Sequence, residues 1–339
     1  MNEKSTALPA LALVPALNST VLPVQSIELA MRTTIKNIQL QHSGQYDQTV
    51  GAEVMATEGN LALIDSVWLE IDGVKKREWK GPALFEANRI TGGAALSQVD
   101  PAVGVAAAKV YSSTLQLDMG RLDLLPRIDP ATGRLDSLSA MTYLDLTNVT
   151  KTYLKIQYAA FTRYVSGNTQ TLMQINLRAT VKELPGYRPD KVRGRQLHFD
   201  LIPVDSAFDM NVTGNDRKIP LLRDGYLTRG LLLRVGTFAA TPNATAITAL
   251  TNVGIKQTLK GGPTIELKEK LPVSVYQQEV GNGRNGIALR AGYLWIDFAS
   301  DKQYGGLQQG NQMATFDLVV DTVAVAGTQM QVFQACSHI

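Results

Sequence analysis

The chain has 339 residues, 45% of them hydrophobic and 6% aromatic, which is an ordinary globular composition and enough chain for two hydrophobic cores. Its longest apolar run is far shorter than the roughly 20 residues needed to cross a bilayer, so no membrane-spanning helix is predicted. The 33 Lys and Arg residues nearly balance the 30 Asp and Glu residues, so a dedicated nucleic-acid-binding protein is not expected. The basic surplus lies in one segment, residues 182–195.

The first 24 residues predict an extended arm rather than an export signal. An apolar stretch follows Lys4, but Glu3 offsets that charge, Pro9 and Pro15 interrupt the stretch, and no small-residue cleavage site follows. Each proline also disfavours a helix at the residue before it. Chain ends are usually disordered unless something holds them. We therefore expect the arm to bind a neighbouring subunit or a lipid surface, or else to pack on its own domain.

Short alternating or β-branched runs bounded by Gly, Asn, Asp and Pro dominate the rest of the chain, which is typical of an all-β protein. In chain order, the predicted strands cover 33–40, 67–71, 114–119, 153–161, 172–181, 231–235, 293–298, 315–325 and 330–335. The two segments with helical character, 102–110 and a stretch near 135–141, are short, and we interpret both as loop insertions.

Three sequence patterns recur in the same order in the two halves of the chain. The patterns of the first half are WKGP, TLQLDM and MQI, beginning at Trp79, Thr114 and Met173. Their counterparts in the second half are LKGGP, YLWIDF and MQV, beginning at Leu259, Tyr293 and Met330. Each match is short, and any two β domains can share such patterns. Three matches in one order nevertheless favour an internal duplication.

The duplication predicts two tandem jelly rolls with near eight strands apiece. The predicted divisions are an extended arm at 1–24, a first jelly roll at 25–184, a basic linker at 185–195 and a second jelly roll at 196–339. The clustered basic residues of the linker could contact phosphates, but Tyr187 is the one aromatic residue among them. A solvated hinge or a site for salt bridges between subunits is favoured instead.

Cysteine and histidine are too scarce for most of the chemistry that depends on them. One cysteine, Cys336, excludes an intrachain disulfide. The three histidines, His42, His198 and His338, lie far apart in the sequence. This scarcity argues against zinc chemistry and against most His-dependent catalysis.

Two further patterns resemble known sites only superficially. A G-x-G-x-x-G run occupies residues 281–286, but we expect a strand before and after it, whereas a dinucleotide site needs a strand-to-helix turn. The aspartates Asp118, Asp123 and Asp129 lack the spacing of an EF-hand loop, so solvation or pairing with nearby arginines is favoured over a bound cation. We predict no catalytic residue, no cofactor and no metal site.

The order of arm, jelly roll, short linker and jelly roll resembles one protein family, as do the paired patterns WKGP/LKGGP, TLQLDM/YLWIDF and MQI/MQV. This family is the double jelly-roll major capsid proteins of tailless, membrane-containing icosahedral bacteriophages, a lineage that includes adenovirus hexon. The resemblance covers essentially the whole chain and is architectural, without a diagnostic motif. It implies a structural coat protein and not an enzyme. Three copies would supply six similar jelly rolls, so a homotrimer would present a nearly hexagonal outline and tile an icosahedral shell over an internal membrane.

The resemblance also implies the partners and the location. The partners would be other copies of the chain and, through the arm, membrane lipids and minor capsid or penton proteins; sequence-specific nucleic-acid binding is not expected. The location would be the virion, after synthesis and assembly in the host cytoplasm.

The alternative is a carbohydrate-binding or carbohydrate-processing protein with two β-sandwiches. Carbohydrate-processing proteins of this kind normally show an aromatic groove with paired carboxylates. Here Trp68, Trp79 and Trp295 lie inside strand patterns, which favours core or interface positions.

Overall fold

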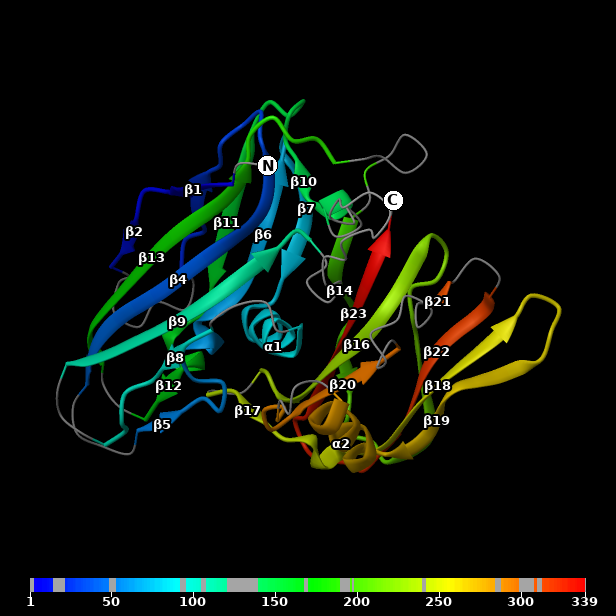
Figure 1. Ribbon diagram of the computed structural model, residues 1–339. Helices are drawn as coiled ribbons and strands as arrows, with labels where there is room; N and C mark the ends of the chain where they lie inside the picture. The colour runs from blue at the N-terminus through cyan, green and yellow to red at the C-terminus, as the bar shows by residue number, and fades with distance from the viewer. Residues whose placement is uncertain are drawn as a thin grey trace. The chain divides into compact units, whose positions relative to one another are not determined.

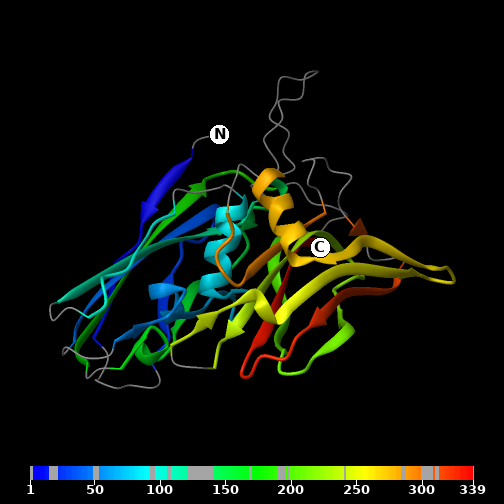
Figure 2. The same cartoon turned by 90° about the horizontal axis from the view of Figure 1, so that it is seen from below.

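The computed structural model describes residues 3–14, 22–48, 53–91, 96–104, 108–120, 140–167, 170–189, 196, 198–239, 242–283, 288–298, 308–309 and 313–338. The chain divides into two units, each built mainly from two β-sheets (Figure 1; Figure 2). The first unit comprises Met1–His198 with Thr241–Asn243, and the second comprises Phe199–Ala240 with Ala244–Ile339. In the part of the chain that is described, no helix is both long and apolar enough to cross a membrane.

The first unit contains two main sheets, which we call the β4 sheet and the β6 sheet. The β4 sheet has the order β1-β13-β4-β9-β8, with β2 paired to β13 and β10 paired to β4. Its strands are β1 (Lys4–Ala7), β2 (Leu11–Leu13), β4 (Thr34–Gln48), β8 (Gln98–Val99), β9 (Lys109–Asp118), β10 (Leu144–Asp145) and β13 (Gln170–Leu184). The β6 sheet has the order β3-β11-β6-β7, with β3 (Gln25–Glu28), β6 (Ile64–Ile71), β7 (Val74–Trp79) and β11 (Thr152–Tyr158). Strands β5 (Val54–Met55) and β12 (Val165–Ser166) form a separate pair, and short 3-10 helices lie at η1 (Gly59–Leu63), η2 (Ala140–Thr142) and η3 (Phe161–Arg163).

The second unit also contains two sheets, which we call the β16 sheet and the β18 sheet. The β16 sheet has the order β14-β23-β16, and β16 pairs on with β17, β20 and β21. Its strands are β14 (His198–Asp209), β16 (Tyr226–Thr237), β17 (Ala244–Thr245), β20 (Tyr293–Asp297), β21 (Gln308–Gln309) and β23 (Gln329–His338). The β18 sheet has the order β15-β22-β18-β19, with β15 (Gly214–Pro220), β18 (Leu250–Leu259), β19 (Thr264–Pro272) and β22 (Met313–Thr322); the 3-10 helix η4 (Ile247–Ala249) precedes β18.

The two units have the same strand order. The eight long strands of the first unit are β1, β3, β4, β6, β7, β9, β11 and β13, and those of the second are β14, β15, β16, β18, β19, β20, β22 and β23. Numbered one to eight in chain order, both sets give the sheets 1-8-3-6 and 2-7-4-5. Two four-stranded antiparallel sheets with long crossing connections form a jelly roll. The chain is therefore a double jelly roll, as predicted from the sequence.

Alternating burial explains why these segments form strands. In β11, Thr152, Leu154 and Ile156 are buried, whereas Tyr153 and Lys155 between them are not. Successive side chains of a strand point to opposite faces of the sheet, so one face of β11 packs into the core and the other faces outward. The apolar faces of the two sheets form the core, which in the second unit is centred on Leu231, Leu233, Val253, Ile255, Leu318 and Val320.

The N-terminal segment is extended, as predicted, but its described part lies on its own unit. Strand β1 pairs with β13 from Lys4 opposite Glu183, and β2 pairs with β13 from Leu11 opposite Leu177. The segment therefore supplies the first strand of the first jelly roll, and that jelly roll begins before residue 25. Leu8 donates its N–H to β13, so the N–H that Pro9 lacks would have pointed away from the sheet.

Among the described residues each unit has one α-helix, at the equivalent place after the fifth strand, and neither helix was expected. Helix α1 (Gly81–Thr91) follows β7, and helix α2 (Val273–Gly283) follows β19. Pro82 occupies the first turn of α1, where its missing N–H costs no helical hydrogen bond. The expected helix at 102–110 is wrong, because Lys109 and Val110 begin β9. The stretch near 135–141 falls mostly outside the described residues, and its end is a 3-10 turn.

Of the three repeated patterns, two lie on equivalent strands of the two units and one does not. TLQLDM and YLWIDF lie on equivalent strands, β9 and β20. MQI and MQV also lie on equivalent strands, β13 and β23, but out of register. In the second unit, Gln331, Arg234 and Tyr293 form one row across three neighbouring strands. The equivalent row of the first unit contains Arg178, so Arg178 is the counterpart of Gln331. The residue that the pattern matched, Gln174, lies four positions earlier. WKGP and LKGGP are not equivalent, because WKGP leads into α1 and LKGGP is the turn between β18 and β19.

Candidate functional site

The three histidines and the cysteine form no metal-binding group in the described residues. The Nδ1 of His198 lies 2.8 Å from the guanidinium of Arg77. His42 is fully buried between Tyr111 and Tyr158, with ring centroids 5.3 and 5.6 Å away, and burial lowers its pKa to about 3. His338 lies 2.6 Å from a carboxylate oxygen of Asp200. Cys336 is buried, and burial raises the pKa of its thiol. A neutral imidazole and a protonated thiol in the interior are suited to packing and not to proton transfer or nucleophilic attack.

The two superficial motifs find no supporting geometry. Gly281 and Gly283 lie at the end of α2, so a helix and not the expected strand precedes the motif, and residues 284–286 fall outside the described residues. A helix that ends at this motif cannot direct its N-terminus at a phosphate bound there. Asp118 ends β9, while Asp123 and Asp129 fall outside the described residues. Within the described part of the chain, no three His, Cys, Asp or Glu residues gather in a metal-binding arrangement.

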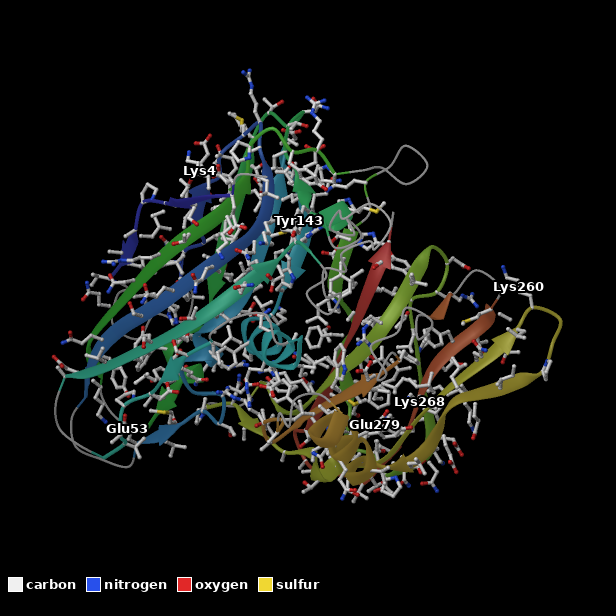
Figure 3. The ribbon with its side chains drawn as sticks, in the orientation of Figure 1. Lys4, Glu53, Tyr143, Lys260, Lys268 and Glu279 are labelled. Carbon is white, nitrogen blue, oxygen red and sulfur yellow. The ribbon has the colours of Figure 1, made fainter. Side chains whose placement is uncertain are left out.

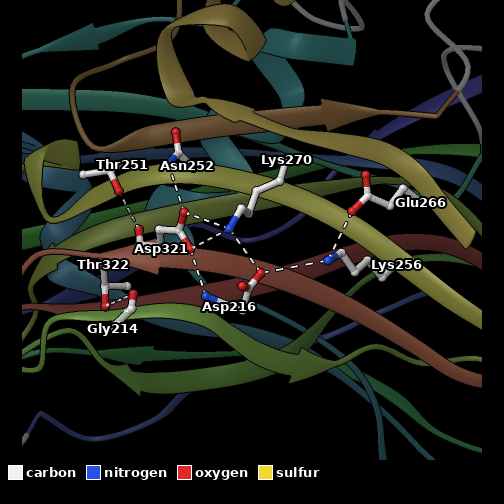
Figure 4. Close-up of polar contacts among 9 residues, drawn as sticks. All are labelled: Gly214, Asp216, Thr251, Asn252, Lys256, Glu266, Lys270, Asp321 and Thr322. Carbon is white, nitrogen blue, oxygen red and sulfur yellow. Dashed lines mark hydrogen bonds and ion pairs between the residues drawn. The ribbon is translucent and has the colours of Figure 1, made fainter. Parts of the chain in front are cut away.

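The most organised polar cluster lies on the outward face of the β18 sheet, which we call the β18 face (Figure 4). Its charged and amide side chains come from all four strands: Asp216, Lys218, Asn252, Lys256, Glu266, Lys270, Asp317 and Asp321. Lys270 is central, with its Nζ 3.1 Å from Asp216 and 3.1 Å from Asp321. Lys256 lies 3.1 Å from Glu266 and 3.9 Å from Asp216, which extends the chain of ion pairs across the sheet.

Asp321 holds the backbone of Asp216 in place as well as the side chain of Lys270. Its Oδ1 accepts a 2.8 Å hydrogen bond from the N–H of Asp216, a residue with φ of 53°, and its Oδ2 accepts one of 2.9 Å from Asn252. Partial burial acts to raise the pKa of Asp321, but these bonds and Lys270 hold it below its usual value. The hydrogen bond to Asp321, and after it the hydrogen bond to Asp216, raise the pKa of Lys270. Asp321 and Lys270 therefore both stay charged over the whole neutral range.

A glycine allows the central lysine to lie across the sheet. A Cβ at Gly254 would stand 2.8 Å from the Cα of Lys270, closer than a real side chain tolerates. Strand β19 is irregular here, with register shifts on both sides of Ile255. Val319, which pairs with Gly254, is on the outward side of β22 and is nevertheless fully buried. The close approach of β19 thus seals the middle of the sheet under the charged cluster.

The outward face of the β6 sheet, the β6 face, has a similar character. Lys155 lies 2.6 Å from Glu70, and Lys75 lies 2.6 Å from Glu78. The Lys75 ammonium also stands over the ring of Trp68, 4.8 Å from its centroid. Trp68 is therefore occupied by a cation of its own sheet and is not an open platform for a sugar ring.

The outward face of the β4 sheet, the β4 face, differs from both. Eleven side chains of its three long strands form its central part: Gln39, Gln41, Ser43, Gln45, Ser112, Thr114, Gln116, Gln174, Asn176, Arg178 and Thr180. Lys182 and Asp118 follow at one end of the face. Only Arg178 among the eleven is charged, and it is exposed beside Gln41. An uncharged polar surface loses less hydration energy on burial than a charged one, so this face is well suited to contact another protein.

Sequence reasoning identified none of these faces. The residues of the β18 face come from positions 216 to 321 and become neighbours only through strand pairing. One local signal existed, the alternation of Lys and Glu in TIELKEKLP, which is β19. On the β4 face the signal was the run of Gln at every second position of β4, at Gln39, Gln41 and Gln45.

Comparison with known proteins finds similarity in structure alone. No family model matches the chain, and no curated protein matches its sequence. The crystal structure of the STIV major capsid protein (Sulfolobus turreted icosahedral virus) has a TM-score of 0.70 and 13% identity, covering 100% of this chain and 97% of that one. The major capsid protein P2 of bacteriophage PM2 has a TM-score of 0.57 and 13% identity, covering 98% and 97%. The PBCV-1 virus capsid has a TM-score of 0.58 and 10% identity, covering 99% and 93%.

These matches extend over both jelly rolls of each protein. The chain has the double jelly-roll fold that these viral capsid proteins share, with similar overall length. At 10–13% identity the likeness is one of fold.

Proposed function

We propose that this chain is the major structural protein of a viral coat. Three copies form a capsomer of pseudo-hexagonal outline, and the capsomers tile an icosahedral shell. The observation that carries the proposal is the fold: two jelly rolls of identical strand order in one chain, aligned over at least 98% of its length with viral capsid proteins. Three such chains supply six similar jelly rolls, which is how a threefold object acquires a nearly hexagonal outline.

The surfaces support a structural role. The β6 and β18 faces form ion pairs within themselves, Lys155 with Glu70 and Lys75 with Glu78 on the first, and Lys256 with Glu266 and Lys270 with Asp216 on the second. We propose that the chain has no catalytic activity and that its partners are copies of itself. The single, buried Cys336 needs no oxidising compartment, consistent with synthesis and assembly in a host cytoplasm and a final location in the virion.

We also propose that an internal membrane lies beneath the shell and that the N-terminal segment, residues 1–24, contacts its lipids. The support is the apolar run Ala7–Val14, in which no side chain is buried and Val14 is 66% exposed. Val14→Asp leaves the pairing of β1 and β2 with β13 in place, so it should preserve trimers. In flotation with phosphatidylcholine–phosphatidylglycerol vesicles it should lose the binding that the parental protein shows. If the parental protein does not float, minor capsid or penton proteins become the partner of this segment.

Light scattering and electron microscopy test the main proposal. Size-exclusion chromatography with light scattering should give three times the 36.8 kDa of one chain. Micrographs should show threefold particles of hexagonal outline, and at high concentration sheets of hexagonally packed particles. A monodisperse monomer that binds oligosaccharides would refute the coat function and support the carbohydrate-binding alternative.

A further inference from the structure

Each jelly roll has two comparable surfaces, the outward face of one sheet and the helix that precedes the sixth strand. In the first unit the side chains in the central part of the sheet face are exposed or half-buried, except for the buried Gln116, whereas the helix is mostly buried. Gln39, Gln41 and Arg178 of the β4 face are exposed. Helix α1 is buried on nearly all sides, including polar positions, with Ala83, Leu84, Phe85, Glu86, Asn88 and Ile90 each at most 5% exposed.

In the second unit the exposure is reversed. The β16 face, the outward face of the β16 sheet, carries the row Phe333, Leu232 and Trp295, and each of these side chains is at most 2% exposed. Over residues 273–280, where burial is described, helix α2 buries a single stripe, Val273, Tyr276 and Val280. Its other side, with Ser274, Val275 and Gln278, is exposed. Each kind of surface is therefore buried once and exposed once in the chain.

The two exposed surfaces match in chemistry. In its central part the β4 face carries one charged residue, Arg178, with Lys182 and Asp118 at one end of the face, and α2 is uncharged except for Glu279. Glu279 is part-exposed and lies 3.2 Å from Lys268 of β19 (Figure 3). Val275 on the helix is 41% exposed, and the β4 face is bordered by Val99 and Val110, which are 56% and 61% exposed. Protein interfaces combine apolar contacts, amide hydrogen bonds and few charges near their centre, which these surfaces would supply.

We infer that helix α2 of one copy packs on the β4 face of the next copy, with Glu279 opposite Arg178. This inference rests on the proposed function, because it specifies the contact that makes the trimer. The contact joins two different surfaces, so it is head-to-tail, and three such contacts close a ring in which no β4 face remains exposed. It also explains why two equivalent sheet faces of one chain differ so much in polarity: the β4 face must be soluble before assembly, whereas the β16 face is buried in the single chain.

Cysteine cross-linking tests the contact directly. The parental chain has one cysteine, which is buried, so new surface cysteines are the only ones that a short bismaleimide should reach. The variant Gln41→Cys with Gln278→Cys should give cross-linked dimers and trimers on a denaturing gel, and no larger species, because the ring closes. The matched control, Gln41→Cys with Glu28→Cys, places the second cysteine on the exposed edge strand β3 and should give none. Equal cross-linking in both pairs, or none in the first, contradicts the contact.

Charge reversal provides an independent test. Arg178→Glu and Glu279→Arg should each raise the dissociation constant of the trimer at least tenfold, and the double reversal should restore most of the affinity. Glu279→Gln reports the separate loss of the Lys268 pair. Circular dichroism of each variant shows whether the chain still folds. If the parental protein is a trimer and the reversals have no effect, the contact is wrong and the coat function stands. If the parental protein is a monomer at every concentration, the proposed function itself fails.

Discussion

Asp321 and Asp118 are both aspartates at the ends of sheet strands, but their surroundings shift the two pKa values in opposite directions. Asp321 accepts hydrogen bonds from Asn252, Lys270 and a backbone N–H, which favour its charged form. Asp118 has Lys36 and Lys182 nearby, but burial outweighs them and raises its pKa to about 6. The two residues should therefore give opposite dependences of stability on pH.

Replacing Asp321 with alanine should destabilise the protein by about 1–3 kcal/mol at pH 7, because it removes charge-assisted hydrogen bonds and leaves buried donors unsatisfied. The pKa of Asp321 is lowered on folding, so its contribution is present above its ordinary pKa of 3.8 and is lost as the pH falls below it. Urea denaturation at pH 7 and at pH 3 should show a gap that closes in acid. Asp317→Ala, on the same strand and face, is the matched control and should change the free energy of unfolding little.

Replacing Asp118 with asparagine should stabilise the protein at pH 7.5. Its pKa is raised from 3.8 to about 6, so the favourable contribution of the protonated form is lost as the pH rises through that interval. The gain should reach up to about 3 kcal/mol and vanish near pH 4, since one pKa unit is about 1.4 kcal/mol. The NH2 group of the new asparagine can point toward Asn88, because the hydrogen bond that Asn88 donates to Asp118 is already long, at 3.5 Å. Thermal unfolding of Asp118→Asn and the parental protein across this pH range measures the gain in stability. Asp224→Asn, at an exposed aspartate, is the control and should show no change of stability with pH relative to the parental protein.

Replacing Gly254 with alanine should cost about 1–3 kcal/mol, the usual penalty for forcing an extra methyl into a packed site. The added Cβ meets the Cα of Lys270, and backbone cannot move aside as a flexible side-chain end could. Thermal denaturation measures the loss, with Thr258→Ala on the same strand as a control expected to stay within about 0.5 kcal/mol. An unchanged midpoint for Gly254→Ala would show that β19 does not approach β18 as closely as described.

At the scale of elements, the N-terminal segment is part of the first jelly roll, because β1 and β2 pair with β13. Because β1 and β2 cover the edge of β13, deleting residues 1–13 should expose the backbone of a fifteen-residue strand and promote aggregation of the first unit. We expect a lower thermal midpoint and a loss of trimers. An arm that only binds a neighbouring subunit or a lipid surface, one of the alternatives that the sequence left open, would instead leave trimers intact and affect only later assembly. Light scattering of the truncated protein distinguishes the two outcomes.

The strands could be predicted where alternation is strong, and the helices could not. Each of the nine predicted runs overlaps a strand, because alternating burial is a local property of the sequence. Strand β7, VKKREW, was missed because it is an edge strand with four consecutive charged residues and no apolar alternation. Helix α2 was missed because Val273, Val275 and two glycines give it poor helix propensity, and contacts with the core outweigh that propensity. Helix α1 did carry a start signal, Pro82 after Gly81.

The candidate surfaces were less predictable than the fold. A face of a sheet combines residues from strands that are far apart in the chain, and its membership depends on register. The pattern MQI/MQV shows the difficulty, because it identified equivalent strands yet placed Gln174 four positions from the true counterpart of Gln331. Register errors of this size leave the fold class unchanged and alter which side chains are neighbours.

At the scale of the whole molecule, the duplicated fold has diverged where its two copies face different surroundings. Gln116 of β9 and Trp295 of β20 occupy equivalent positions. Gln116 belongs to the polar β4 face, whereas Trp295 belongs to the buried, apolar row of the β16 face. The cores of the two units need only apolar residues at alternate positions. The outward faces therefore carry most of the information about assembly, and this is why two similar jelly rolls in one chain can make two different contacts.

Assembly through these faces should make the stability of the protein depend on its concentration. Only folded chains form the trimer, so association stabilises the folded state by mass action. The thermal midpoint of the parental protein should rise by about 1–2 °C for each tenfold increase in concentration, given the unfolding entropy of a chain of this size. At each concentration Arg178→Glu should have a lower midpoint than the parental protein, because its weaker association stabilises the folded state less. Differential scanning fluorimetry over a hundredfold range measures both. Equal midpoints for Arg178→Glu and the parental protein over the whole range would assign the stabilising contact to a surface other than the β4 face.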